Sequence, residues 1–198
     1  MSRDRSESMN RRSGLPGWFD RIRYKEIYRQ ALGLLLVAVS AWVATPGDSR
    51  VWAGLAIAAA GQLFRIFAAG TIFKNRRLAT SGAYALVRHP LYLGNVLILG
   101  GFALAAGSLP LAVVILAFFL VWYPAAVRYE DAKLEGFFGD EWRQWRAGTH
   151  AIFPGRLNRE ALADAGWNAR QSLLRNGELY ITLYLAACAV GLWVRAHA

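Results

Sequence analysis

Arg88 and His89 are adjacent residues just before a long apolar segment, in the stretch ALVRHPLYLGN at residues 85–95. Pro90 has no N–H and a fixed φ, which suits the first turn of a helix, and the residues just before a proline avoid helical conformation. Arg88 and His89 are therefore expected at a helix N-terminus, where free N–H groups and the helix dipole favour an anion. The simpler alternative is an arginine on lipid phosphate beside a helix-capping histidine.

Acidic side chains form a second cluster with possible chemistry. Glu130 and Asp131 come directly after another apolar run, next to Tyr129. Two adjacent carboxylates can hold a cationic ligand group. The alternative is the solvated first turn of an amphipathic helix, where acids are favoured in any case.

Three basic side chains are candidates for catalytic groups. Arg65 lies three residues after Gln62 within an apolar block, and a charge inside such a block is a functional candidate by default. Snorkelling of Arg65 to the nearby membrane surface is the competing interpretation. Arg128 precedes the acidic pair, and His150 is the histidine other than His89 that is expected on the same side of the membrane.

Five apolar blocks must position these residues. They cover residues 28–45, 51–73, 91–106, 109–127 and 179–194, in a chain of 198 residues that is 56% hydrophobic. A helix of about 20 apolar residues crosses a hydrocarbon core, and a backbone in lipid must satisfy its own hydrogen bonds. The sequence therefore predicts an all-α, multi-pass membrane protein with about five spans. A soluble bundle is disfavoured because almost no polar chain would remain to cover the blocks.

The basic residues predict the orientation of these spans. Residues 1–29 carry eight Lys or Arg and residues 128–177 carry eight more, whereas the loops at 46–50 and 107–108 hold one between them. Basic loops stay in the cytoplasm, so the N-terminus is expected inside and the C-terminus outside. The net charge of +10 then reflects topology and attraction to membrane lipids, rather than nucleic-acid binding. A single cysteine, Cys188, makes neither an internal disulfide nor a cysteine metal site.

Polar segments connect the spans. Residues 1–20 are expected to be a disordered tail, and residues 21–198 a single membrane-embedded domain. The turns TPGD and GSLP close two helical hairpins. After the fourth span, apolar residues recur at three- and four-residue spacing through Trp142 and Trp145, which predicts an amphipathic helix broken at Gly139. Residues 156–177 repeat this pattern more weakly. The arginine–histidine cluster and the acidic pair are thus expected on the same side of the membrane.

Taken in order, SGAYALVRHPLYLGN, a helical hairpin and RYEDAKLEGFFGDEWRQW…IFP resemble the isoprenylcysteine carboxyl methyltransferase and phospholipid methyltransferase superfamily. The resemblance covers residues 81–154. The chain departs from the family pattern at several positions, and a further span follows the closing proline. These departures are Ala83, Asp131, Trp142, Trp145 and His150.

The resemblance implies a membrane methyltransferase that uses S-adenosylmethionine and a lipophilic acceptor. The acceptor would be an isoprenylcysteine-like carboxylate, a phospholipid or another small hydrophobic molecule. The residues that it implies for the cofactor are Tyr84, Val87, Arg88, His89, Pro90, Tyr92, Gly94, Glu130 and Asp131. In this interpretation Arg88 and the helix N-terminus bind the donor's carboxylate, and Glu130 binds its ammonium.

Two other functions fit parts of the same sequence. A membrane reductase of the sterol-reductase type would have a similar C-terminal half and would use NADPH, although such enzymes usually have more spans. A non-catalytic membrane scaffold could retain the fold without the reaction. The oligomeric state and the acceptor atom stay open at this point.

Overall fold

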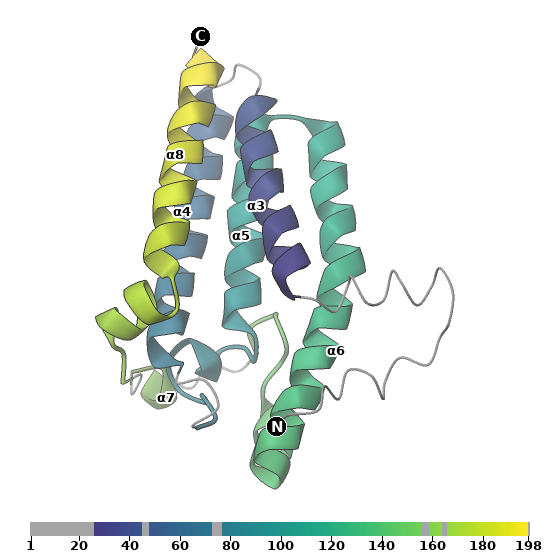
Figure 1. Ribbon diagram of the computed structural model, residues 1–198, viewed down its shortest axis with the longest axis vertical. Helices are drawn as coiled ribbons and strands as arrows, with labels where there is room; N and C mark the ends of the chain where they lie inside the picture. The colour runs from purple at the N-terminus through teal and green to yellow at the C-terminus, as the bar shows by residue number, and fades with distance from the viewer. Residues whose placement is uncertain (1–25, 45–47, 73–76, 156–158, 164–165, 198) are drawn as a thin grey trace.

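The computed structural model describes residues 26–44, 48–72, 77–155, 159–163 and 166–197, and all regular elements within these ranges are helical. The predicted all-α class is therefore confirmed, while the predicted tail at residues 1–20 lies outside the described residues. With the labels of Figure 1, the elements are α3 (Glu26–Trp42), α4 (Asp48–Thr71), η1 (Gly82–Ala85), α5 (Pro90–Ala106), α6 (Leu109–Gly148), α7 (Arg159–Ala163), η2 (Gln171–Arg175) and α8 (Glu178–His197).

Three of these helices are long and apolar enough to cross a membrane: Ser49–Thr71 in α4, Leu109–Gly148 (α6) and Glu178–His197 (α8). The apolar helix α5 is shorter, with 17 residues, and α3 also has 17. The described residues thus form a multi-pass membrane protein, and the count of five spans stays a prediction.

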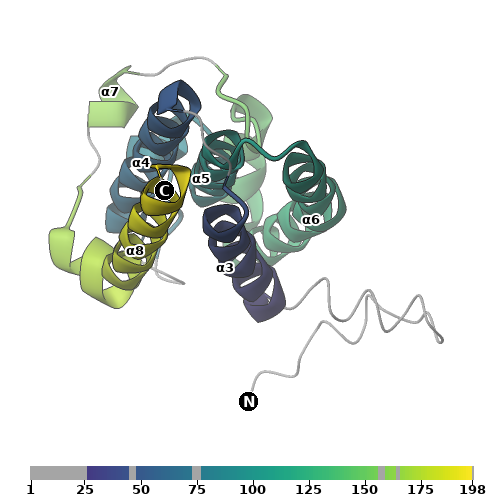
Figure 2. The same cartoon turned by 90° about the horizontal axis from the view of Figure 1, so that it is seen from above.

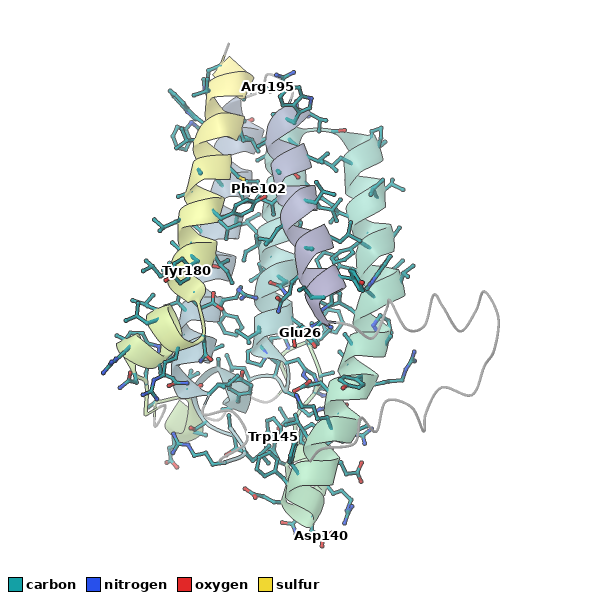
Figure 3. All side chains as sticks on the ribbon, in the orientation of Figure 1. Glu26, Phe102, Asp140, Trp145, Tyr180 and Arg195 are labelled. Carbon is teal, nitrogen blue, oxygen red and sulfur yellow. The ribbon has the colours of Figure 1, made fainter. Side chains whose placement is uncertain are left out.

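The five long helices lie alongside one another in one bundle (Figure 1). Seen from above, α5 lies between α4 and α6, and α3 and α8 lie next to each other against it (Figure 2). Phe102 of α5 is 1% exposed at the centre of the apolar core. In Figure 3 its label lies midway along the bundle. One helix therefore touches the other four long ones, and its N-terminal end is where Pro90 begins it.

Glycines allow α4 and α5 to pack with their backbones in contact. A Cβ atom added at Gly101 would lie 2.5 Å from the Gly54 carbonyl oxygen and 2.6 Å from the Ala58 nitrogen. One added at Gly61 would lie 2.7 Å from Leu97 Cβ. Small residues at such spacing are the usual way for helices to approach closely in lipid, where van der Waals packing replaces the hydrophobic drive. This contact fixes the position of the α5 N-terminus relative to α4.

The hairpin between α5 and α6 has the turn chemistry that GSLP predicts. Gly107 ends α5 with φ 66°, a left-handed conformation in which glycine has no Cβ penalty. The Ser108 hydroxyl then accepts a hydrogen bond from the Leu111 N–H at 3.5 Å and caps α6.

The predicted amphipathic helix is not a separate element. It continues α6 directly from the apolar part at residues 109–127, with a kink at Gly139, and α6 reaches past the other helices in Figure 1. Residues 128–148 carry nine charged side chains and residues 109–127 carry none, so only the first part of α6 has the composition of a membrane-spanning segment. The predicted break at Gly139 is confirmed by its non-helical φ of 53° and ψ of −120°.

A buried polar network ties α8 to α4 and α5. Arg65 Nη2 lies 2.6 Å from Glu178 Oε1, and Arg65 Nη1 donates to Asn95 Oδ1 at 2.6 Å. Gln62 Nε2 donates to Glu178 Oε2 at 3.1 Å and to the Thr182 hydroxyl at 2.8 Å. Because Glu178 is 1% exposed, its charge needs the arginine as a counterion. Arg65 therefore does not snorkel to the surface.

The segment before α8 covers the C-terminal end of α4. The last carbonyls of a helix have no partner within the helix. At this end of α4, four carbonyl oxygens accept hydrogen bonds of 2.7–3.1 Å from the segment. The acceptors are Ile66, Ala69, Gly70 and Ile72, and the donors are Trp167, Asn168, Gln171, Ser172 and Asn176. Residues 166–177 are thus a cap for α4 that also leads the chain into α8.

Adjacent glycines in α5 offer a matched test of the helix contact. We expect Gly101→Ala to lower the free energy of unfolding by about 1–3 kcal/mol, because the new methyl group collides with the α4 backbone. Gly100→Ala should be neutral or stabilising by up to about 1 kcal/mol, because a Cβ at Gly100 meets nothing within 4 Å. Thermal unfolding of both variants in detergent measures the difference. Equal unfolding temperatures would contradict the close packing.

Candidate functional site

A cavity of about 250 Å³ opens where α5 begins and the charged half of α6 leaves the bundle. Figure 3 labels two of its residues, Glu26 at the N-terminus of α3 and Trp145 near the end of α6. The complete lining is Glu26, Ile72, Arg77, Leu78, Ala79, Tyr84, Arg88, His89, Leu91, Tyr92, Glu130, Lys133, Leu134, Phe138 and Trp145. Two motifs that are far apart in the sequence therefore meet at one cavity.

Asp131 holds both members of the arginine–histidine pair. Its Oδ2 accepts from Arg88 Nη2 at 3.0 Å, and its Oδ1 accepts from His89 Nε2 at 2.7 Å. Burial would raise the pKa of Asp131, but the hydrogen bonds and charges of His89 and Arg88 outweigh it and hold this pKa below its usual value. The carboxylate is thus ionised and fixes the beginning of α5 to α6.

The main chain around His150 completes this clamp. Arg88 N–H donates to the His150 carbonyl at 2.8 Å, and His89 N–H donates to the Ala151 carbonyl at 2.9 Å. The Arg88 guanidinium also donates to the Thr149 carbonyl. The N–H groups of Arg88 and His89, which precede α5, are therefore bound by a segment about 60 residues further along the chain. The prediction that the N-terminus of α5 binds an anion stays a prediction.

The two neighbouring acids have different surroundings. Asp131 is buried against Arg88 and His89, whereas Glu130 lines the cavity. Lys133, one turn further along, lies 3.5 Å from Glu130 in a partly exposed pair. Successive helical residues point about 100° apart, so one acid can build the wall while the other faces the space.

Aromatic rings line the cavity and support its charged residues. His89 and Tyr92 stack with ring centroids 5.3 Å apart. Trp142 is completely buried, 5.7 Å from the Arg88 guanidinium and in edge contact with Trp145. Burial raises the pKa of the Tyr84 phenol, so this group stays a neutral hydrogen donor at physiological pH.

Several predicted residues support the site from outside the cavity. Val87 and Pro90 are buried beneath it, and Gly94 receives the Arg65 side chain, which a Cβ atom would displace. Arg128 and His150 are exposed, and the His150 ring lies against Gly155. Arg65 belongs to the network with Glu178. None of these six lines the cavity, and the catalytic roles of Arg65, Arg128 and His150 stay predictions.

Other cavity residues were missed by the sequence interpretation. Leu134 and Phe138 lie four and eight residues after Glu130, so helical spacing alone could have placed them on its face. Glu26 comes from the beginning of α3, more than 50 residues before the other motifs, and no local pattern marks it. Its place follows only from how α3 packs against α5, α6 and α8.

These features define a class of protein: a multi-pass helical bundle with a cavity at one end that is lined by charged and aromatic residues. The family model for phospholipid methyltransferases matches residues 28–141, more than half of the chain. The chain therefore belongs to the phospholipid methyltransferase family. The resemblance predicted from its motifs is thus confirmed.

Three relatives show the range of proteins that the chain is similar to. The cobalt-zinc-cadmium resistance protein CzcN of Cupriavidus metallidurans is 37% identical over 102 residues, 51% of this chain and 46% of that protein. The nickel-cobalt-cadmium resistance protein NccN of Alcaligenes xylosoxydans xylosoxydans is 28% identical over 137 residues, which are 65% of this chain and 63% of that protein. The protein-S-isoprenylcysteine O-methyltransferase of Schizosaccharomyces pombe is 36% identical over 98 residues, which are 46% of this chain and 39% of that protein.

The chain thus spans less than two thirds of the length of each of these relatives. No solved structure matches it.

The Asp131 clamp predicts a pH-dependent stability. A carboxyl whose folded pKa is lowered stabilises the fold above its unfolded pKa of about 4, and this contribution is lost as the pH falls through the folded value. Asp131→Asn should therefore cost about 1–3 kcal/mol of unfolding free energy at pH 7. The difference from wild type should shrink steadily below about pH 4.

Thermal unfolding across this pH range measures the effect. Asp140→Asn is the matched control, since Asp140 forms an exposed pair with Arg143 in the same helix and should change stability by less than about 0.5 kcal/mol. A pH-independent loss in Asp131→Asn would contradict an ionised clamp.

Proposed function

We propose that the protein is a membrane methyltransferase that uses S-adenosylmethionine and acts on a lipophilic acceptor. The observation that carries this proposal is the meeting of the two predicted motifs at one cavity, with Tyr84, Arg88, His89, Tyr92 and Glu130 in its lining. Membership of the phospholipid methyltransferase family supports it. The similarity to an isoprenylcysteine O-methyltransferase supports it further.

The residues of the cavity fit the methyl donor. The donor has a zwitterionic amino-acid end, a cationic sulfonium and an adenosine. Glu130 and Glu26 place carboxylates in the lining for a cationic group, and Arg88 and Lys133 place cations there for a carboxylate. Arg88 also keeps a donor, because its Nε–H is without a hydrogen-bond partner among the described residues. Both charges of the amino-acid end thus have candidate counterions.

When bound, S-adenosylmethionine supplies an electrophilic methyl group on sulfur that is transferred by in-line displacement. The protein contributes alignment and a site with little water. In this proposal Glu130 binds the ammonium group, and Arg88, held by Asp131, binds the carboxylate. Tyr84 and Tyr92 line the cavity, and aromatic rings can stabilise a neighbouring cation.

The acceptor decides whether a base is needed. A carboxylate or thiolate attacks without losing a proton, whereas an amine must first lose one. His150 is the candidate base for an amine acceptor, and Arg65 and Arg128 are the other candidate catalytic groups. The reaction is proposed at the cytoplasmic end of a five-span bundle with its N-terminus inside and its C-terminus outside, where a water-soluble donor and a membrane-borne acceptor can meet.

Binding calorimetry on the protein in detergent tests the donor site. Glu130→Gln should weaken S-adenosylmethionine binding about tenfold or more, because a charge-assisted hydrogen bond is worth about 1.5–3 kcal/mol. Glu141→Gln is the control: Glu141 is exposed in the same helix and outside the cavity lining, so this variant should bind as wild type does.

Binding calorimetry, together with an assay of methyl transfer to lipid extracts, separates the alternative functions. Binding of NADPH in place of S-adenosylmethionine would replace the proposal with a reductase. Unchanged affinity in Glu130→Gln would remove this acid from the donor site. Donor binding without methyl transfer to any lipid extract would favour a scaffold.

A further inference from the structure

Two arginines, Arg29 and Arg65, are buried in the described bundle and Arg88 is nearly so, and among these three only Arg29 has no counterion among the described residues. Arg65 is paired with Glu178, and Arg88 is paired with Asp131. Arg29 of α3 is equally buried, at 9% exposure, yet none of the described residues forms an ion pair with it. A buried charge normally has a partner of opposite sign, because desolvation without one costs several kcal/mol.

Snorkelling does not account for Arg29. A snorkelling side chain reaches along the surface to water and leaves its charged end exposed. Arg29 turns inward instead, with its guanidinium carbon 4.8 Å from the centroid of the Tyr92 ring. The rest of the helix around it is exposed, including Ile27, Tyr28 and Gln30. The arginine is therefore the inward-facing residue of this turn.

Arg29 lies directly beside the proposed donor site. Tyr92, which it contacts, lines the cavity and stacks on His89. Glu26, one turn earlier on the same face of α3, also lines the cavity and accepts a hydrogen bond from Gln30 at 2.8 Å. The acids that share this region, Glu26 and Glu130, do not pair with Arg29. Its positive charge is left for a ligand.

The side of Arg29 that leads into the bundle is apolar and aromatic. Tyr92 contacts Tyr123 of α6 with ring centroids 5.3 Å apart, and Tyr123 contacts Phe119 at 4.6 Å and Phe118 at 5.8 Å. These rings belong to α5 and to the membrane-spanning part of α6, next to α3. A cation at the cavity end of a row of core aromatic rings is suited to a molecule with an anionic head and an apolar chain.

We propose that Arg29 binds the anionic head group, a carboxylate or a phosphate, of the lipophilic methyl acceptor. The aromatic rings of α5 and α6 then contact the chain of that molecule, and Tyr92, which lines the donor cavity and contacts Arg29, lies beside its head group. This assignment rests on the proposed function, since it names the acceptor class for the same site. Arg29 is a specificity-determining residue in this arrangement.

Head-group selectivity tests the assignment in nanodiscs of phosphatidylcholine. The probes are dodecanoate, dodecyl phosphate and dodecylamine, which share one chain and differ in charge. Wild-type protein with S-adenosylmethionine should bind at least one of the two anionic probes about tenfold more tightly than dodecylamine. The stronger of the two identifies carboxylate or phosphate as the head group.

Substitutions then assign this preference to one side chain. Arg29→Gln should abolish it, and Arg29→Lys should keep part of it, because lysine retains the charge but not the planar fork. Arg143→Gln should behave as wild type, since Arg143 is an exposed arginine in surface pairs of α6. Calorimetry of S-adenosylmethionine on the same samples should give equal affinity for wild type and Arg29→Gln.

The outcomes separate the two proposals. Unchanged anion preference in folded Arg29→Gln overturns the assignment. Equal binding of all three probes to the wild-type protein also overturns it, and this outcome does not depend on the folding of any variant. Absence of S-adenosylmethionine binding in a wild type that still prefers anions overturns the proposed function and leaves the anion site of Arg29 in place.

Discussion

A charge that is withdrawn from water into a helical bundle needs a counterion, and this constraint determines how the helices are joined. The Arg65–Glu178 pair joins α4 to α8, and Asn95 extends it to α5. The Arg88–Asp131 pair joins the beginning of α5 to α6. Apolar packing in lipid is weakly directional, because lipid tails and side chains are equally apolar. The buried ion pairs therefore specify which helix faces meet, in addition to the backbone contact between α4 and α5.

The same constraint gives the cavity one rigid wall. Each carboxylate oxygen of Asp131 accepts one hydrogen bond, from Arg88 or His89, and the carbonyls of residues 149–151 accept hydrogen bonds from those same two residues. A ligand that enters the cavity thus meets Arg88 and His89 already oriented, and little ordering is required on binding. Glu130 is placed differently: it faces the space with only a weak lysine neighbour, so it can exchange that neighbour for a ligand cation.

Local chemistry could be predicted from the sequence, whereas long-range partners could not. Pro90 and Gly139 act through their own backbone restrictions, so the start of α5 and the break in α6 were both predicted correctly. Glu178 meets Arg65 across 113 residues, and no spacing rule links them. The partners of the Arg88 and His89 N–H groups could not be predicted for the same reason: the carbonyls that bind them belong to a distant segment. Glu26 reaches the cavity only through the packing of α3.

The family match ends at residue 141, yet the site depends on the chain that follows. Trp142 is completely buried beside Arg88, and residues 149–151 bind the same arginine and its neighbour. Residues 166–177 cap α4, and Glu178 neutralises Arg65, whose side chain fills the space next to Gly94. Without Glu178, Arg65 would be a second buried cation lacking a counterion, close to Arg29 in the half of the bundle that holds the cavity. The C-terminal helix is therefore part of the charge balance of the site, and within the described parts of the chain the buried arginine without a counterion is Arg29, which contacts the cavity residue Tyr92.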